Sequence, residues 1–446
     1  MCVESSLGKS DRVTLNNIVM QGSVSGGTLC SNQLSKLCKE THNEGIVYMF
    51  RNKIPIPSLA MVDDIATMTL CNSIDSVEKN IKTNEFIKRK KLESQVGEGK
   101  CQWLHSGKEP CRNSYIAGST KISQCDVYKY LGDHVADGFN PLYKKRVEKA
   151  VGYSVSCTAM CTEMSLGYQF FSIAKLLLQS IFLNGVLVKM ETWVNFTTDR
   201  IEQFERVEQG YLRKILQAHS KTPTESLYLE LGVVPFRYHL MSRRILYYQT
   251  IMQRNEDEIT RMVVESQKMD ELKGDFYSQV KEDMKNIKIS ESLIQYGSNK
   301  KLSDIIKENI KIEALRYLKL KASSHSKIRG ELYNSLEGKE YFFNHRLTSD
   351  KAKLLFQFRT RMFGVRNNFR NMYSCILCPL CGKEDDTQQH LVNCEVIQCY
   401  EPITFDYEDI FSDDSETLVT VANKLARLVE LREEIYSSLH HDNCNE

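Results

Sequence analysis

The sequence predicts an α+β protein, with short strands confined to the first third of the chain and mostly helices after it. Up to about residue 140, short apolar runs alternate with glycines and prolines, a pattern typical of strands and turns. Within this part, a basic helix is predicted from about residue 75 to residue 96. From Pro141 onward, apolar residues recur at helical spacing. The clearest such series is Ile201, Phe204, Val207, Tyr211 and Ile215.

The composition is that of a globular protein in a reducing compartment. Apolar residues make up 41% of the 446 residues and charged residues 26%, which allows a packed core. The opening sequence MCVESSLGKS lacks the apolar segment of a secretory signal, so we expect an intracellular protein, in the nucleus or cytoplasm. We therefore expect its fifteen cysteines to be free thiols or metal ligands.

The most apolar stretch, residues 173–188, is interrupted by polar residues. A membrane-spanning helix needs about 20 predominantly apolar residues. We therefore predict a buried helix here and no contact with a membrane.

Two adjacent aspartates, Asp63 and Asp64, lie inside an apolar segment, residues 58–70. Apolar runs on both sides of a polar pair predict a strand–turn–strand hairpin. Carboxylates at its tip can hold the two Mg²⁺ ions, about 3.5–4 Å apart, that phosphoryl transfer uses. The alternative is an ordinary solvated turn, which Asp also favours, and the pair alone does not decide between them.

A cysteine–histidine cluster with the spacing C-x2-C-x8-H-x3-C follows much later, at Cys378, Cys381, His390 and Cys394. Two thiolates of a CxxC turn, joined by an imidazole and a third thiolate, form a typical tetrahedral Zn²⁺ site. Cys375 forms a second CxxC with Cys378, so the spacing leaves open whether Cys375 replaces Cys378 or Cys381 as a ligand.

The net charge of only +2 hides a basic segment, residues 350–370, followed by an acidic tail. Basic residues can contact phosphates, and interleaved phenylalanines can stack on bases. For several of the phenylalanines, core packing of a helix is the stronger alternative. The predicted nucleic-acid contacts are Lys351, Lys353, Arg359, Arg361, Arg366 and Arg370.

Four short motifs, in this order, resemble those of reverse transcriptases of non-LTR (LINE-type) retrotransposons. Gln21, Gly22 and Ser23 resemble the turn that lies against the incoming nucleotide and template, and residues 60–64 resemble the paired-aspartate hairpin that follows it. Lys100 resembles the lysine of the next palm segment, and residues 130–132 (YLG) resemble the strand at the start of the thumb. Residues 222–232 (TPTESLYLELG) and the CPLC of the cysteine cluster extend the resemblance.

The resemblance implies a partial reverse-transcriptase palm at residues 1–140, made of short antiparallel strands plus helices. Thumb-like helices would follow at 141–222, and a helical extension at 223–370. A zinc-knuckle-like segment would occupy 371–400, before an acidic helical tail at 401–446.

The implied function is RNA-directed DNA polymerisation, with element RNA as template, target-site DNA as primer, Mg²⁺ at Asp63 and Asp64, and no small-molecule cofactor beyond nucleotides. Only residues 1–20 precede the Gln-Gly-Ser turn, so we expect the family's first catalytic aspartate and its fingers to be missing. The chain as given is then expected to be inactive, a fragment or relic. The alternative is a non-catalytic RNA- or DNA-binding protein that retains the thumb and zinc-knuckle contacts.

Overall fold

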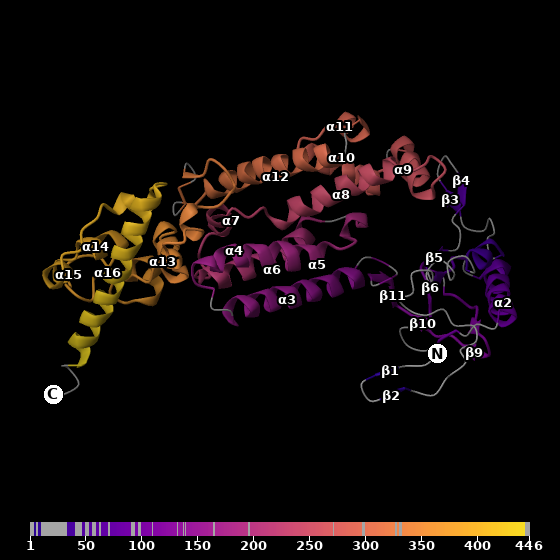
Figure 1. Cartoon of the computed structure of the whole chain (residues 1–446), viewed down its shortest axis with the longest axis horizontal. Coiled ribbons are helices and arrows are strands. Elements are labelled where there is room, and N and C mark those ends of the chain that lie inside the picture. Colours follow the sequence, from indigo (N-terminus) through magenta and orange to yellow (C-terminus); the bar gives the residue numbers. More distant parts are fainter. Residues whose placement is uncertain are drawn as a thin grey trace. The chain divides into compact units, whose positions relative to one another are not determined.

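In the computed structural model, helices make up most of the described residues, and every described strand precedes residue 137 (Figure 1). This mostly helical architecture with a few short strands is compatible with the predicted α+β class. The structure describes residues 4–5, 8–9, 34–40, 47–49, 53–55, 59–61, 64–69, 72–90, 94–96, 100–108, 110–131, 133–136, 138, 140–163, 166–194, 197–270, 272–296, 299–325, 328–329 and 332–441.

The chain forms two compact units. The first comprises Met1–Arg146 and Arg254–Leu272, and the second comprises Val147–Gln253 and Lys273–Glu446. The division is coarser than the five segments predicted from the sequence. Since residues 254–272 belong to the first unit, the chain passes between the units three times.

The described strands of the first unit form two-stranded pairs. Five of these pairs are antiparallel, and β7 with β10 is parallel. The strands are β1 (Glu4–Ser5), β2 (Gly8–Lys9), β3 (Val47–Met49), β4 (Lys53–Pro55), β5 (Leu59–Met61), β6 (Asp64–Ala66), β7 (Trp103–Leu104), β8 (Ile116–Ala117), β9 (Thr120–Lys121), β10 (Gln124–Cys125), β11 (Val127–Tyr130) and β12 (Asp133–Ala136).

The hairpin predicted around the paired aspartates is present. Strands β5 and β6 are antiparallel, and the pair nearest the turn is Met61 with Asp64. Asp64 is therefore the first residue of β6, whereas Asp63 lies outside the described residues.

The helix after this hairpin, α2 (Ile74–Arg89), begins where Ser73 caps it, because the Ser73 hydroxyl accepts a hydrogen bond from the Ser76 N–H at 3.2 Å. Its end carries Lys88 and Arg89, whose charge suits the helix C-terminus. Phe86 packs with Leu34 and Leu37 in a small core. The sequence had predicted this helix to run to about residue 96.

The second unit is an assembly of helices, and α9 (Ile259–Asp270) belongs to the first. Helix α8 packs against α6, α10 and α12, and α16 packs against α13. The α-helices are α3 (Asn140–Glu163), α4 (Phe170–Leu177), α5 (Asn184–Leu187), α6 (Thr198–Leu216), α7 (Thr224–Leu231), α8 (Phe236–Met252), α10 (Phe276–Asn286), α11 (Glu291–Tyr296), α12 (Asn299–Ala322), α13 (Ser349–Arg359), α14 (Gln388–Asn393), α15 (Glu395–Tyr400) and α16 (Ser415–His441). Between them lie a π-helix, η2 (Leu178–Leu183), and the 3-10 turns η1 (Gly167–Gln169), η3 (Met190–Thr192), η5 (Glu340–Phe342), η6 (Arg366–Met372) and η7 (Tyr407–Phe411).

One helical stretch among the described residues, Gly167–Leu187, is long and apolar enough to cross a membrane by length and composition alone. One face of it lies in the core of the second unit, through Phe171, Leu178, Phe182 and Val186. The buried helix predicted for residues 173–188 is therefore confirmed only in part, since 39% of the apolar window is buried and Leu176 is exposed.

A buried polar network ties α7 to α13. The Glu230 carboxylate accepts hydrogen bonds from the Arg359 guanidinium at 3.0 Å and from the Tyr341 hydroxyl at 2.6 Å. The Tyr333 hydroxyl donates to the same carboxylate. A second donor of Arg359 reaches the Ile410 carbonyl at 2.7 Å.

This network corrects part of the predicted nucleic-acid surface. Arg359 is only 4% exposed, and its guanidinium forms an ion pair with the Glu230 carboxylate, so it cannot contact a phosphate. Lys353 is 8% exposed, with its ammonium 3.2 Å from Asp350 and 4.7 Å from the centre of the Phe170 ring. The interleaved phenylalanines Phe356, Phe358 and Phe369 are buried, so they pack in the core.

Candidate metal centre

A tight turn presents the first two ligands of the predicted site. The strand-like bridge between Leu377 and Asp385 folds the chain back on itself, and the Cys378 N–H donates to the Glu384 carbonyl at 2.7 Å. The Gly382 N–H donates to the Cys378 carbonyl at 2.9 Å. Gly382 has φ +66°, a conformation that glycine adopts without strain, so this residue closes the CxxC turn.

A short helix presents the other two ligands. Helix α14 begins where the Thr387 hydroxyl accepts a hydrogen bond from the His390 N–H at 2.9 Å. His390 lies in α14, and Cys394 follows at its end, where α15 begins. Residues four apart lie on one side of a helix, which directs the imidazole and the thiol toward the CxxC turn.

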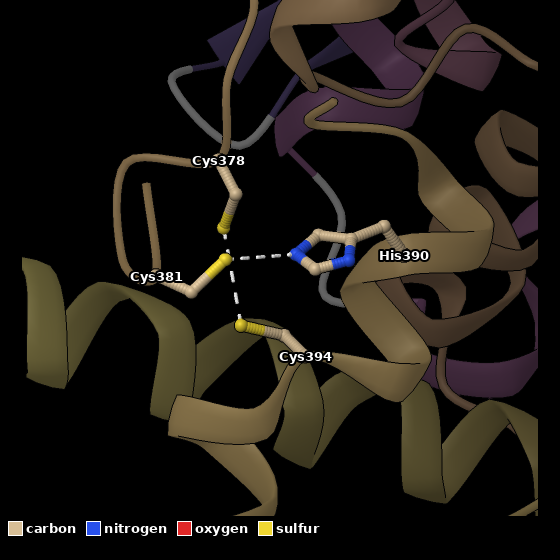
Figure 2. Close-up of side chains that lie close together, drawn as sticks. All are labelled: Cys378, Cys381, His390 and Cys394. Carbon is tan, nitrogen blue, oxygen red and sulfur yellow. Dashed lines mark hydrogen bonds between the residues drawn. The ribbon is translucent and has the colours of Figure 1, made fainter. Parts of the chain in front are cut away.

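The four side chains converge on one point (Figure 2). Their ligand atoms all lie within 4.8 Å of one another. The sulfur atoms of Cys378 and Cys394 are 3.9 Å apart, and the Cys381 sulfur is 3.4 Å from Nε2 of His390. Tetrahedral Zn²⁺ with Zn–S bonds of about 2.3 Å separates its sulfur ligands by roughly 3.8 Å. The cluster can therefore hold one metal ion such as Zn²⁺.

Burial distinguishes this ligand set from the alternative with Cys375. Cys378, His390 and Cys394 are 3%, 9% and 0% exposed, whereas Cys375 is exposed and lies outside the converging group. The choice that the spacing left open is thus resolved by the geometry in favour of Cys378 and Cys381. Three thiols and one imidazole fill all four positions of a tetrahedron, as in structural zinc sites, and leave none for a substrate.

The electrostatics of the cluster favour a thiolate. A hydrogen bond from the Cys394 thiol, together with backbone N–H groups of Leu380 and Cys381, lowers the pKa of Cys378 to about 4. The same hydrogen bond raises the pKa of Cys394. Thiolates are the form in which cysteine binds metals, so the turn that presents Cys378 also prepares it as a ligand.

Glu384 supports the site from outside the ligand set. Its carboxylate lies 3.0 Å from Nδ1 of His390, which donates to it when Nε2 is the ligand nitrogen. Such a partner fixes the orientation of a ligating imidazole. Glu384 is not among the residues predicted from the sequence. Its only sequence signal is a carboxylate between the CxxC turn and the histidine.

Asp386 anchors this segment to its surroundings. Its side chain is fully buried and 2.8 Å from the guanidinium of Arg432 in α16, and it accepts the Arg366 N–H at 2.8 Å. The predicted acidic tail is therefore not a separate appendage. Its helix buries Leu425, Leu428 and Leu431 within the second unit.

Of the remaining basic residues of the predicted nucleic-acid surface, Arg366 and Arg370 lie beside this segment, and the Arg370 guanidinium is 3.8 Å from the Asp385 carboxylate. Arg361 and Arg370 are exposed, and Arg366 is half-buried. The Arg366 guanidinium donates to the Leu377 carbonyl at 3.2 Å and lies 5.7 Å from the centre of the Tyr373 ring. Lys351 donates to the Asn423 side chain at 2.6 Å.

The residues predicted to bind nucleotide, template and Mg²⁺ are only partly described. Gln21, Gly22, Ser23 and Asp63 lie outside the described residues. Lys100 is exposed at a bend, where its carbonyl accepts a hydrogen bond from the Tyr128 hydroxyl at 2.6 Å. The structure therefore brings together the four predicted metal ligands of the second unit. The roles predicted for the polymerase residues stay predictions, because most of these residues lie outside the described part of the chain.

Comparison of the chain with family models, with curated proteins and with solved structures found no match. The site is accordingly interpreted from its own geometry.

Proposed function

We propose that the chain is part of a non-LTR retrotransposon reverse transcriptase, and that it binds RNA template and DNA primer. The observation that carries the proposal furthest is the convergence of Cys378, Cys381, His390 and Cys394. These residues occupy the place, late in the order of motifs, where the resemblance has its zinc-knuckle-like segment.

The hairpin of β5 and β6 supports the polymerase ancestry, because Asp64 is the first residue of β6 and pairs with Met61 at the end of β5. In this proposal Asp63 and Asp64 hold Mg²⁺, which supplies charge stabilisation for phosphoryl transfer when bound. Gln21, Gly22, Ser23 and Lys100 would contact the nucleotide and template.

The nucleic-acid contact proposed for the second unit is a basic rim, formed by Arg366 and Arg370 beside the metal segment and by the exposed Arg361 that precedes them in the sequence. Tyr373, 44% exposed, adds an aromatic ring on which a base can stack. The rim replaces the larger set predicted from sequence, because Lys353 and Arg359 are buried in ion pairs.

Metal stoichiometry tests the observation on which the proposal depends. The full chain should contain one Zn²⁺, and Cys378→Ser should lose it. Cys375→Ser is the matched control, since Cys375 is an exposed cysteine three residues away, and it should retain the metal. Equal zinc content in both variants would contradict the assigned ligand set.

Salt dependence of RNA binding tests the rim. Replacing Arg361, Arg366 and Arg370 together with glutamine should weaken binding and reduce the slope of log K against log salt by roughly two to three units. Removing three exposed charges elsewhere in the second unit, at Lys281, Lys285 and Lys307, is the matched control and should change the slope less. Equal slopes for the two triple variants would place the interface elsewhere.

The second candidate function is nucleic-acid binding without chemistry. It requires only the basic rim and the metal site, whose four protein ligands would stabilise the fold and leave no position for a reacting group. Primer extension on an RNA template tests the expected inactivity of the chain as given, and both candidates predict activity at background. Extension that disappears in Asp63→Ala and Asp64→Ala would contradict that expectation and would exclude the non-catalytic alternative.

A further inference from the structure

A cavity of about 270 Å³ lies in the second unit, away from the metal segment. Helices α4, α8 and α12, which border it, are labelled in Figure 1. Its apolar lining includes Leu178, Leu183, Val233 and Leu336, all at most 5% exposed.

Two lysines from different helices reach this cavity, Lys175 of α4 and Lys311 of α12. The Lys175 ammonium donates to the Leu231 carbonyl at 3.1 Å and to the Glu337 carbonyl at 3.3 Å. An ammonium has three N–H donors, so these two bonds leave one for a ligand. Lys311 lies 3.8 Å from the Glu337 carboxylate, which is 71% exposed at the rim.

The two ammonium groups repel each other. Burial and the positive charge of Lys311 together lower the pKa of Lys175. Like charges brought together beside apolar walls destabilise a fold unless an anion compensates them, and the exposed Glu337 carboxylate does so only in part.

His239 adds an acceptor to the same cavity. Burial lowers its pKa to about 4, so the imidazole is neutral at physiological pH. The Val234 backbone opposes this shift in pKa, and a neutral imidazole carries one acceptor nitrogen. The cavity thus combines two cations, one neutral acceptor and an apolar lining.

We propose that this cavity binds a small phosphate monoester with a compact apolar body, its phosphate between Lys175 and Lys311 and its body against Leu178 and Val233. Lysine is a point charge that binds phosphate well, and the apolar lining favours a ligand that carries more than the bare anion. The cavity is at the small end of the ligand pockets found in proteins, so the body is about the size of a single ring.

Calorimetry of the full chain with three probes tests the ligand class. Phenyl phosphate should bind. Inorganic phosphate, which lacks the body, and phenol, which lacks the anion, should each bind at least about ten-fold more weakly, because each loses one of the two kinds of contact. No binding of phenyl phosphate at millimolar concentration would overturn the proposal, as would equal affinity for all three probes.

Two substitutions beside the cavity test where the anion binds, because we expect them to change the affinity in opposite directions. Lys311→Met should weaken phenyl phosphate binding about ten-fold, and Glu337→Gln should tighten it several-fold, because they remove an attractive and a repulsive charge. Lys307→Met, one turn away on α12, removes an exposed lysine outside the cavity and should have no effect. A shared loss in Lys311→Met and Lys307→Met would contradict the assigned position.

Discussion

Arg359 and Arg361 are two residues apart and have opposite environments. Arg359 is buried against Glu230, whereas Arg361 is exposed. Composition and local spacing cannot distinguish them, because the partner of Arg359 is 129 residues away in the sequence. A local pattern predicts that a segment is basic, but only the folded chain shows which of its charges remain available to a partner.

Replacing Arg359 should therefore test folding and not RNA binding. Arg359→Met leaves the Glu230 carboxylate buried without its cation, and we expect the free energy of unfolding to fall by about 3–5 kcal/mol. Arg361→Met is the matched control and should stay within about 0.5 kcal/mol. Urea denaturation measures both. Unchanged stability in Arg359→Met would contradict the buried ion pair.

Glu208 predicts a pH dependence of stability. Its carboxyl group is buried in α6, where it accepts hydrogen bonds from the Tyr228 hydroxyl and the Phe236 N–H, and burial raises its pKa to about 8 from an ordinary value near 4.5. Between these two values the folded state holds a proton that the unfolded state has released. The free energy of unfolding therefore decreases as the pH rises through this window, by on the order of a few kcal/mol.

Glu208→Gln should remove most of that decrease, because the amide is a neutral group of the same shape. Glu202→Gln, at an exposed position of the same helix, should leave it intact. Chemical denaturation at several pH values between 5 and 8 measures how the free energy of unfolding changes with pH in the wild type and in each variant. The same pH dependence in wild type and Glu208→Gln would show that another group is responsible for the decrease.

At the scale of elements, the C-terminus of α7 depends on one glycine. Gly232 has φ +61°, and an added Cβ would lie 2.0 Å from the backbone nitrogen of Gly338. Gly232→Ala should therefore destabilise the protein by at least about 2 kcal/mol. Gly210→Ala is the control, since Gly210 lies inside α6 with open space around it, and alanine should stabilise the helix by roughly 0.5–1 kcal/mol. Thermal denaturation should show a lower melting temperature for Gly232→Ala and a higher one for Gly210→Ala.

The metal segment predicts a second behaviour at this scale. None of residues 379–385, which form the turn, is buried, so bound metal should supply much of the folding free energy of this segment. A chelator should increase amide exchange there and leave α6 and α8 protected. Cys394→Ser should show the increase without a chelator, and equal exchange with and without metal would contradict a structural role for the ion.

The elements predicted most accurately from the sequence are those whose structure depends on residues close together in the chain. The cysteine–histidine spacing predicted the ligand set because a CxxC turn and residues four apart on a helix need no distant partner. The hairpin around Asp64 follows from alternating apolar and polar runs in the same way. The end of α2 was predicted about seven residues late, because nothing in the basic sequence after Arg89 marks a stop.

At the scale of the whole molecule, the five predicted segments correspond to two compact units. The sequence gives no sign that residues 254–272 belong with the front of the chain, because membership of a unit depends on contacts between segments far apart in sequence. For the same reason the acidic tail, separate by composition, has its helix α16 packed within the second unit.

The pairing of Asp386 with Arg432 links the metal segment to α16 across 46 residues of sequence. In evolutionary terms, we expect substitutions at the two positions to be coupled. A premature stop codon before position 432 would leave the Asp386 carboxylate buried and unpaired, although every metal ligand was still encoded. Related sequences should therefore keep an acid at one position and an arginine at the other, or lose both together, and the reading frame should stay open through α16 wherever the cysteines persist.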